Sequence, residues 1–154
     1  MTEKRYELVK AESSQEWEAL HDMRRSELFV RREGVTYNTN HPDDHTPTHF
    51  PLVLKLDGNT IGTARLDLFD NDESAIRLVA IAKNGQRKGH GRILWQMFET
   101  FARSKSVTRV YVNSFPTAVG YYERLGFIRG EWNEPSGAPR SGLGAGCIQM
   151  TKAI

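Results

Sequence analysis

The pattern of apolar and polar positions predicts a set of short strands. Tyr6–Lys10 alternates and is expected to form the first strand. Residues 50–56 and 60–69 alternate on either side of an Asp-Gly-Asn sequence, which is typical of a hairpin turn. Residues 74–82 are apolar enough for a central strand. The last three stretches together predict an antiparallel meander.

Apolar residues at helical spacing predict three helices. Ser13, with a glutamate three residues later, has the pattern of a capping box and begins an apolar stripe that predicts a helix over residues 16–30. A second stripe begins near His90. A short helix is expected over residues 117–125, and Gly126 after it suits the left-handed position that ends a helix.

The rest of the chain predicts further strands at residues 107–113, 127–132 and 147–153. The element order is then β-α-β-β-β-α-β-α-β-β. This order predicts one α+β domain over residues 1–154, built on a mixed, mostly antiparallel sheet of about seven strands that is flanked by helices.

Composition narrows the class of protein. The chain has 154 residues, of which 38% are hydrophobic and 26% charged, and this balance is typical of a folded globular domain. A net charge of +2 gives no case for nucleic-acid binding. No apolar run suits a signal peptide or a membrane span, so no membrane association is expected. A single cysteine, Cys147, excludes an internal disulfide and favours a reducing, cytoplasmic setting.

A glycine-rich, basic segment stands before the second predicted helix. Residues 84–92 read Asn-Gly-Gln-Arg-Lys-Gly-His-Gly-Arg. An ordinary turn into a core helix would explain the glycines alone. A phosphate cradle would explain the glycines and the cations together, because free N–H groups at a helix start bind phosphate oxygens. The spacing lacks the Gly-Lys-Ser/Thr of a Walker loop and the third glycine of a dinucleotide fingerprint.

Two motifs resemble the GNAT superfamily of N-acetyltransferases. Residues 86–91, Gln-Arg-Lys-Gly-His-Gly, match its Q/R-x-x-G-x-G/A signature, and they follow an apolar strand and open an amphipathic helix. Residues 118–127, Ala-Val-Gly-Tyr-Tyr-Glu-Arg-Leu-Gly-Phe, resemble its A-x-x-F-Y-x-x-x-G-F segment. The resemblance implies the layered α/β/α GNAT fold, with a splay between the fourth and fifth strands. It also implies transfer of an acetyl group from acetyl-coenzyme A to a primary amine within a ternary complex.

The same resemblance implies a cofactor site and an acid. Main-chain N–H groups of the signature loop would bind the pyrophosphate, and the strand before it would pair with the pantetheine arm. Tyr122 occupies the place of the family's tyrosine that protonates the leaving thiolate, and a phenol with a pKa near 10 is protonated at neutral pH. Tyr121 is expected to be a core residue. The implied cofactor-binding residues are Leu78, Val79, Ala80, Ile81, Gln86, Arg87, Lys88, Gly89, His90, Gly91, Arg92, Asn113 and Tyr122.

Two features depart from the family pattern. Phe115 stands where relatives often carry an asparagine, and Asn113 lies nearby but out of register. Residues 74–82 contain no carboxylate to serve as a general base, so another base, a water chain or an already neutral amine must serve. Two of the candidate bases have a simpler interpretation than catalysis. Glu27 could be a solvated side chain on its helix, and Asp67 could simply face water on its strand. The candidate bases are Glu27, Glu33, Asp67 and His49.

Upstream residues resemble the ElaA/YjcF-type subfamily more specifically. The matches are Arg25 with Phe29, then Asp43-Asp44, His49, and Gly62 with Arg65-Leu66. Acyl-homoserine-lactone synthases share these features, so a synthase of that kind is an alternative. A non-catalytic module that binds acyl-coenzyme A is another, because the strand glutamate is missing.

The loop over residues 36–48 carries histidines and aspartates near the expected acceptor pocket. Its acids could favour a cationic amine, or they could simply supply turn chemistry. Pro47 stands between His45 and His49, so these two histidines are not expected to share a helix face, and no metal is expected. The expected partner is a small-molecule or peptide amine, and a homodimer remains open because many relatives dimerise.

Overall fold

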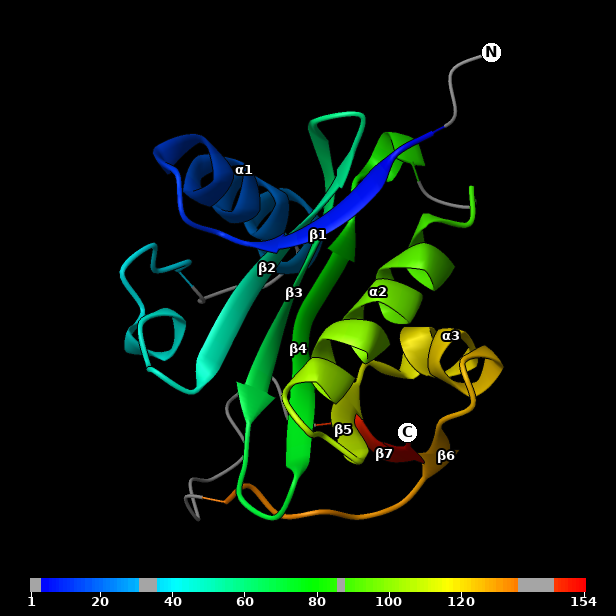
Figure 1. Ribbon diagram of the computed structural model, residues 1–154. Helices are drawn as coiled ribbons and strands as arrows, with labels where there is room; N and C mark the ends of the chain where they lie inside the picture. The colour runs from blue at the N-terminus through cyan, green and yellow to red at the C-terminus, as the bar shows by residue number, and fades with distance from the viewer. Residues whose placement is uncertain (1–3, 31–35, 86–87, 136–145) are drawn as a thin grey trace.

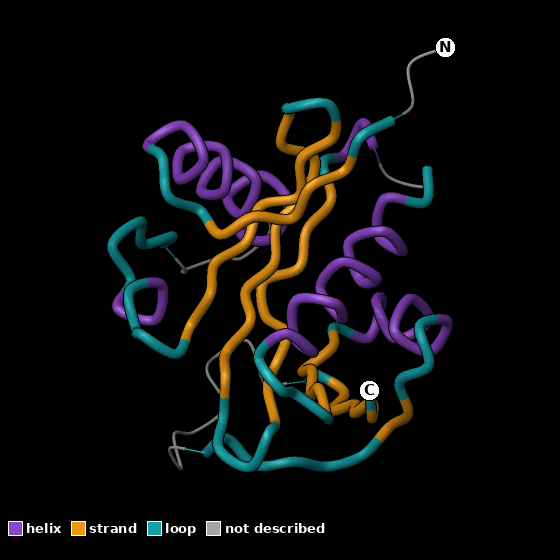
Figure 2. The backbone as a smooth tube through the Cα atoms, in the orientation of Figure 1, coloured by secondary structure: helices purple, strands orange, loops and turns teal. Residues whose placement is uncertain are grey.

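The computed structural model describes residues 4–30, 36–85, 88–135 and 146–154. Its backbone forms one seven-stranded sheet with helices on both faces (Figures 1 and 2). In sheet order the strands are β1 (Tyr6–Lys10), β2 (His49–Leu56), β3 (Asn59–Leu68), β4 (Glu73–Ile81), β5 (Arg109–Ser114), β7 (Ile148–Ala153) and β6 (Ile128–Arg129). Neighbouring strands are antiparallel except β4 and β5, which run parallel. The predicted fold class is confirmed.

Local sequence explains the meander of β2, β3 and β4. At the turn between β2 and β3, Asp57 and Gly58 have φ of 51° and 85°. Two consecutive left-handed residues make a hairpin turn whose twist matches that of the strands, and Asp-Gly is a favoured pair for it. The predicted strands are therefore present, with ends that differ by one or two residues.

The helices are α1 (Ser14–Arg24), α2 (His90–Ser104) and α3 (Val119–Arg124). The capping box is confirmed: Ser13 Oγ accepts from the Glu16 N–H at 3.1 Å, and Glu16 Oε1 accepts from the Ser13 N–H at 3.0 Å. Gly126 has φ of 98° and follows α3 as expected. Short 3₁₀ turns in the described ranges are Pro42–Asp44, Lys83–Gly85 and Pro116–Ala118.

The first helix departs from the prediction of a single α-helix over residues 16–30. After Arg24 the chain continues as a π-helix, Arg25–Phe29. A π-helix pairs residues i and i+5, so it shifts the side chains that follow it by about one position around the axis. Helical spacing in the sequence carries no mark of this change.

The sheet is buried on both faces, with α1 on one face and α2 and α3 on the other (Figure 1). Alternation along β2 explains this arrangement. Leu52 and Leu54 join the larger core cluster with Leu94 and Phe98 of α2, whereas Val53 packs on the opposite face with Leu20 of α1.

The sheet opens between β4 and β5. These strands pair only at Glu73–Ala75 of β4 with residues 109–111 of β5. Beyond that point β5 pairs with β7 as far as Ser114, and residues 76–81 of β4 have no strand on that side within the described residues. Leu78 has φ of 51° at a bulge in β4, where the pairing with β3 shifts between Thr63 and Arg65. The predicted splay is confirmed.

Candidate active site

A cleft of about 2410 Å³ opens where β4 and β5 separate. Its wall combines β4, the start of α2, the end of β5, α3 and the π-helix. The structure thus brings together most of the residues expected from the sequence. Those that line the cleft are Glu27, His49, Asp67, Leu78, Val79, Ala80, Ile81, Gly89, Gly91, Arg92, Asn113 and Tyr122. Glu33, Gln86 and Arg87 lie outside the described residues.

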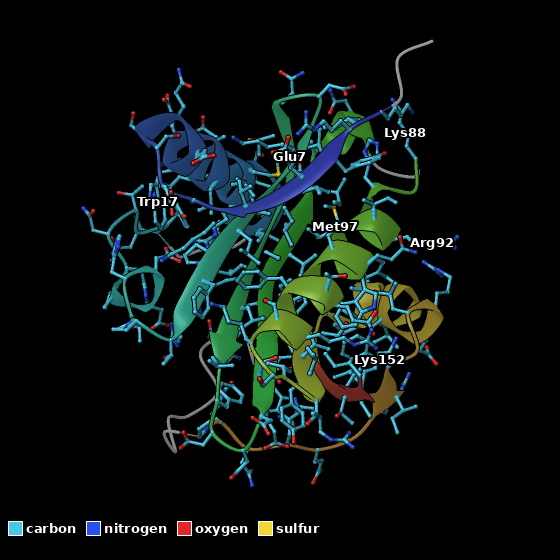
Figure 3. The ribbon with its side chains drawn as sticks, viewed as in Figure 1. Glu7, Trp17, Lys88, Arg92, Met97 and Lys152 are labelled. Atoms are coloured by element: carbon cyan, nitrogen blue, oxygen red, sulfur yellow. The ribbon has the colours of Figure 1, made fainter. Side chains whose placement is uncertain are left out.

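The start of α2 presents main-chain donors and positive charge. Gly89 precedes the helix with φ of 82°, a left-handed conformation that glycine adopts at no steric cost. The first N–H groups of a helix have no acceptor within it, and the helix dipole is positive at this end. Lys88 and Arg92 are exposed at the start of α2 (Figure 3). This geometry suits an anion.

Packing explains two further features of this loop. A Cβ on Gly91 would lie 3.0 Å from Tyr121 Cε1, and the Tyr121 hydroxyl donates to the Gly91 carbonyl at 2.6 Å. Tyr121 therefore joins α3 to the first turn of α2. A Cβ on Gly85 would lie 2.8 Å from Nδ1 of His90, whose side chain is buried. The His90 imidazole belongs to the core, which leaves its main chain for a ligand.

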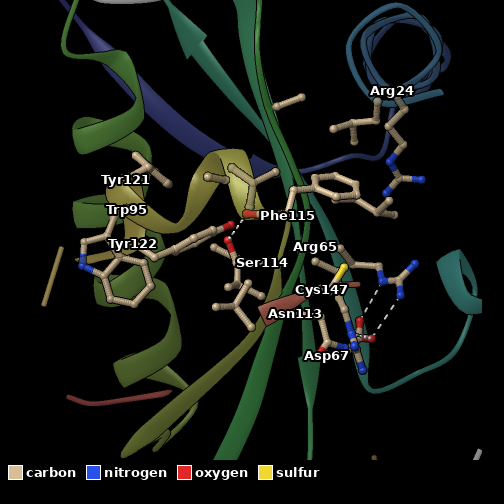
Figure 4. Close-up of a pocket in the computed structure, with 18 of the residues that line it drawn as sticks. Arg24, Arg65, Asp67, Trp95, Asn113, Ser114, Phe115, Tyr121, Tyr122 and Cys147 are labelled. Carbon is tan, nitrogen blue, oxygen red and sulfur yellow. Dashed lines mark hydrogen bonds and ion pairs between the residues drawn. The ribbon is translucent and has the colours of Figure 1, made fainter. Parts of the chain in front are cut away.

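Tyr122 lies on α3 with its ring in the core and its hydroxyl directed at the cleft. The residue is 5% exposed, and its ring meets Phe127 edge-on. Figure 4 shows its hydroxyl pointing toward Ser114 at the end of β5. Burial raises the pKa of Tyr122 above its ordinary value of 10, so the phenol is protonated at neutral pH. Tyr121 is partly buried and packs against the core as expected, but Tyr122 is the more deeply buried of the two.

The opposite side of the cleft carries alternating charges. Arg65 Nε and Nη2 donate to the two oxygens of Asp67 at 2.7 and 3.0 Å. Arg77 Nε donates to Asp67 Oδ2 at 3.0 Å, and its two Nη atoms hold Glu134 at 2.7 and 2.5 Å. Asp67 is 2% exposed, so the alternative that it faces water was wrong. On β3, Asp67 is paired with Arg77 of the neighbouring strand, and the alternation of apolar and polar residues does not reveal such a partner.

The series continues to the end of α1. Arg24 Nη1 donates to Asp44 Oδ2 at 2.8 Å, and Asp44 Oδ1 lies 3.5 Å from Arg65 Nη1. Burial opposes the ionisation of Asp44, but the two guanidinium groups prevail and lower the pKa of its carboxyl. We call this set the arginine–carboxylate chain. Its members, in order, are Arg24, Asp44, Arg65, Asp67, Arg77 and Glu134.

The arginine that lines this cleft is Arg24, a neighbour of the Arg25 that the subfamily match named. The Arg25 side chain is 48% exposed and pairs with Asp22 at 2.8 Å. Arg24 is 1% exposed and lines the cleft together with Phe29. The i, i+5 spacing of the π-helix brings Arg24 and Phe29 to one side, whereas the R-x-x-x-F pattern assumes the spacing of an α-helix.

His49 and Asn113 also line the cleft, and they differ in how far their polar atoms are hydrogen-bonded. His49 Nδ1 lies 2.6 Å from the Asp43 carbonyl oxygen, so that nitrogen carries the proton and Nε2 holds the lone pair. Asn113 Nδ2 donates to Glu134 at 3.4 Å, whereas Asn113 Oδ1 is buried without a donor. An orphaned buried acceptor in a cleft invites a ligand donor.

The described residues give two findings on metal binding and on membrane spans. Within them, no group of three or more His, Cys, Asp or Glu side chains could hold a metal ion. No helix among the described ranges is long and apolar enough to cross a membrane.

The sequence and the fold are similar to those of known proteins. A model of the acetyltransferase (GNAT) family matches residues 17–127. An acetyltransferase of the GNAT family from Staphylococcus aureus has a similar structure, with a TM-score of 0.76 at 15% identity over 97% of this chain and 99% of that one. Escherichia coli ElaA superposes with a TM-score of 0.72 at 17% identity, over 97% and 99% of the two chains.

A third structure was determined with ligands. N-acetylglutamate synthase from Neisseria gonorrhoeae, complexed with coenzyme A and L-arginine, gives a TM-score of 0.68 at 19% identity. The match covers 97% of this chain and 33% of that protein. At these identities the three likenesses concern the fold.

Proposed function

This chain belongs to the acetyltransferase (GNAT) family, and from that premise we propose that it transfers an acetyl group from acetyl-coenzyme A to an amine. One observation carries the proposal. The open edge of β4 runs between a helix start that suits phosphate and a buried tyrosine that can supply a proton. A long, thin thioester with a phosphate-rich end needs these three features in one cleft.

The start of α2 would hold the pyrophosphate. Main-chain N–H groups from Lys88 to Arg92 would donate to its oxygens, as helix starts do for phosphates in general. The side chains of Lys88 and Arg92 add charge beside them. Gln86 and Arg87 belong to the same proposed loop. In support, coenzyme A is bound in the N-acetylglutamate synthase structure of similar fold.

The open edge of β4 would hold the pantetheine arm. Main-chain groups of residues 78–80 that face the splay have no strand to pair with among the described residues, so they could bond the amides of an extended ligand, and Ile81 continues the same edge. Asn113 Oδ1 offers one further acceptor across the gap. At the Leu78 bulge the pairing with β3 is interrupted, and a main-chain N–H there would stabilise the oxygen of an attacked thioester carbonyl.

Tyr122 would serve as the general acid. When the amine nitrogen attacks the thioester carbonyl, the C–S bond breaks and negative charge develops on sulfur. A protonated phenol at that point donates its proton to the leaving thiolate. The raised pKa keeps Tyr122 protonated over the whole neutral range, so its proton is in place when charge develops on the sulfur.

His49 is the best-supported candidate for the base that takes the amine proton. Its hydrogen bond to the Asp43 carbonyl fixes the tautomer with a lone pair on Nε2, and the residue lines the cleft. Asp67 already accepts three N–H bonds, which leaves little capacity for another proton. Glu27 also lines the cleft, on the π-helix, and Glu33 stays a candidate from the sequence alone.

Calorimetry with acetyl-coenzyme A tests the cofactor site directly. We expect binding with a dissociation constant in the micromolar range, and no heat at several hundred micromolar would contradict the proposal. Amine-dependent thiol release would then separate an enzyme from a module that only binds acyl-coenzyme A. Release that requires S-adenosylmethionine in place of a simple amine would instead favour a lactone-forming synthase.

A further inference from the structure

The guanidinium of Arg24 has one edge without a partner. The residue is 1% exposed, and its Nη1 donates to Asp44 Oδ2 at 2.8 Å and to the Tyr37 hydroxyl at 3.3 Å. Its Nε and Nη2 are buried and have no hydrogen-bond acceptor among the described residues. Buried guanidinium donors are almost always paired, because desolvating them without an acceptor is costly. This edge therefore requires an explanation.

The same molecule shows what such an edge is suited to hold. In Arg65, the equivalent Nε and Nη2 atoms grip the two oxygens of Asp67 at 2.7 and 3.0 Å. Arg77 also engages both of its edges, with Asp67 and Glu134. In the arginine–carboxylate chain, Arg24 is the member with an open fork, and a fork of this shape fits a carboxylate bidentately.

The charges around Arg24 leave room for one more anion. The arginine–carboxylate chain contains three cations and three anions, and Arg24 is its terminal cation, paired with Asp44. Its neighbour His21 is held near neutral: burial, followed by the charge of Arg24, lowers the pKa of that imidazole. The arriving anion would thus meet a guanidinium that shares its charge with one carboxylate only.

Arg24 also stands at the correct place for the acceptor. It lines the cleft that contains Tyr122, but from the α1 side of the sheet (Figure 4). Phe115 lines the same cleft as Arg24 and Tyr122, so a molecule held by Arg24 would share this space with an aromatic ring and the tyrosine. Screening from bulk water strengthens a charge-assisted bond at this depth.

We propose that the open edge of Arg24 binds a carboxylate of the acceptor, so that the acceptor is an amino acid or another amine that carries a carboxylate. The inference rests on the proposed function, because it assigns one end of the acceptor to Arg24 and the other, the amine, to the thioester. It separates the chain from acetyltransferases whose acceptors are uncharged beyond the amine.

Binding of carboxylate and carboxamide pairs tests the proposal. The protein saturated with coenzyme A is titrated with single L-amino acids and with their carboxamides, and the melting temperature is recorded. We expect at least one amino acid to raise it, because a ligand that binds only the folded state stabilises that state, and its carboxamide to bind about 100-fold more weakly. Equal shifts from acid and amide, or no shift from any amino acid, would overturn the proposal.

Two variants make the test specific to the fork. R24K keeps a positive charge beside Asp44 but lacks the Nε–Nη2 edge, so the preference for acid over amide is expected to disappear while coenzyme A affinity is kept. D44N removes the ion pair but leaves the edge, so it is expected to lower the melting temperature and retain the preference. Retention of the preference in R24K would show that Arg24 has a structural role alone.

Turnover distinguishes failure of this inference from failure of the proposed function. Thiol release from acetyl-coenzyme A is measured with the same acid and amide pairs. Absence of acetyl-coenzyme A binding would contradict the acetyltransferase itself. Binding and turnover of simple amines at rates equal to those of amino acids would leave the acetyltransferase intact and overturn the role of Arg24.

Discussion

The two sides of the cleft solve the burial of polar groups in opposite ways. On the side of α2 and α3, which we call the tyrosine side, Tyr122 is buried among apolar rings, and desolvation raises its pKa. On the side of α1 and β3, the arginine side, charged groups are buried because each has partners of opposite sign. Desolvation on the tyrosine side keeps the Tyr122 phenol protonated. Ion pairing on the arginine side fixes the positions of the charged side chains.

This difference teaches where function and stability overlap. Removing a neutral hydroxyl from the tyrosine side changes the chemistry with little cost to the fold. Removing one charge from the arginine side leaves its neighbours buried and unpaired, which destabilises the protein. The following experiments test that contrast, beginning with the largest expected effect.

Breaking the centre of the arginine–carboxylate chain is expected to have the largest effect. D67N leaves Arg65 and Arg77 without their shared anion, and we expect the free energy of unfolding to fall by about 3–5 kcal/mol. Urea denaturation measures it. D43N is the matched control, because Asp43 is half-exposed and lies 3.9 Å from Arg65, and it should cost less than about 1 kcal/mol. Equal costs for the two variants would contradict the contrast.

On the tyrosine side, Y122F is expected to lower kcat by about 100-fold, because a general acid contributes at least that factor. Affinity for acetyl-coenzyme A should not change, since the ring remains. Y121F is the control: it loses the bond to the Gly91 carbonyl, so it should cost about 1 kcal/mol of stability while kcat is kept. An unchanged kcat in Y122F would remove that residue from the chemistry.

The turn that carries the proposed phosphate site is expected to tolerate no side chain. In G91A the new Cβ would lie 3.0 Å from Tyr121 Cε1, and the resulting shift should weaken acetyl-coenzyme A binding by about tenfold. G120A on α3 serves as the control, because its nearest atom would be Arg124 Nη1 at 3.4 Å and alanine favours a helix. Calorimetry of both variants separates loss of a site from loss of helix structure.

An ion pair outside the cleft provides the smallest effect. The Lys55 ammonium, followed by the N–H groups of Ser13 and Glu12, lowers the pKa of Glu16 from 4.5 to about 2. The stabilisation is present above the unfolded value and is lost as pH falls toward the folded one. E16Q should therefore cost about 1 kcal/mol near pH 7 and nothing near pH 2. A cost independent of pH would point to the cap hydrogen bonds rather than the charge.

The same contrast shows what the sequence can predict. Local signals identify the tyrosine side: the glycine turn, the start of α2, Gly126 after α3, and Tyr122 in register with them. They also predict the strands, because alternation reports burial on each face. The splay followed from the family resemblance, and its physical sign, a short β4–β5 ladder, appears only in three dimensions.

The arginine side resists such prediction. Arg24, Asp44 and Glu134 come from distant segments, and nothing in their neighbourhoods marks them as partners. The π-helix adds a second difficulty, because it shifts Phe29 around the helix axis relative to Arg24, which precedes it. Sequence spacing reports periodicity, and here the periodicity changes within one helix.

The splay also determines which partners can use the exposed main chain of β4. An unpaired strand edge normally attracts other strands and promotes aggregation. Here the open edge lies inside the sheet, between β4 and the diverging β5, and Leu78 bulges within it. A second polypeptide strand carries side chains on both faces and needs a flat, regular edge. A single linear chain with few branches needs neither, so this edge suits the proposed pantetheine arm better than it suits an added strand.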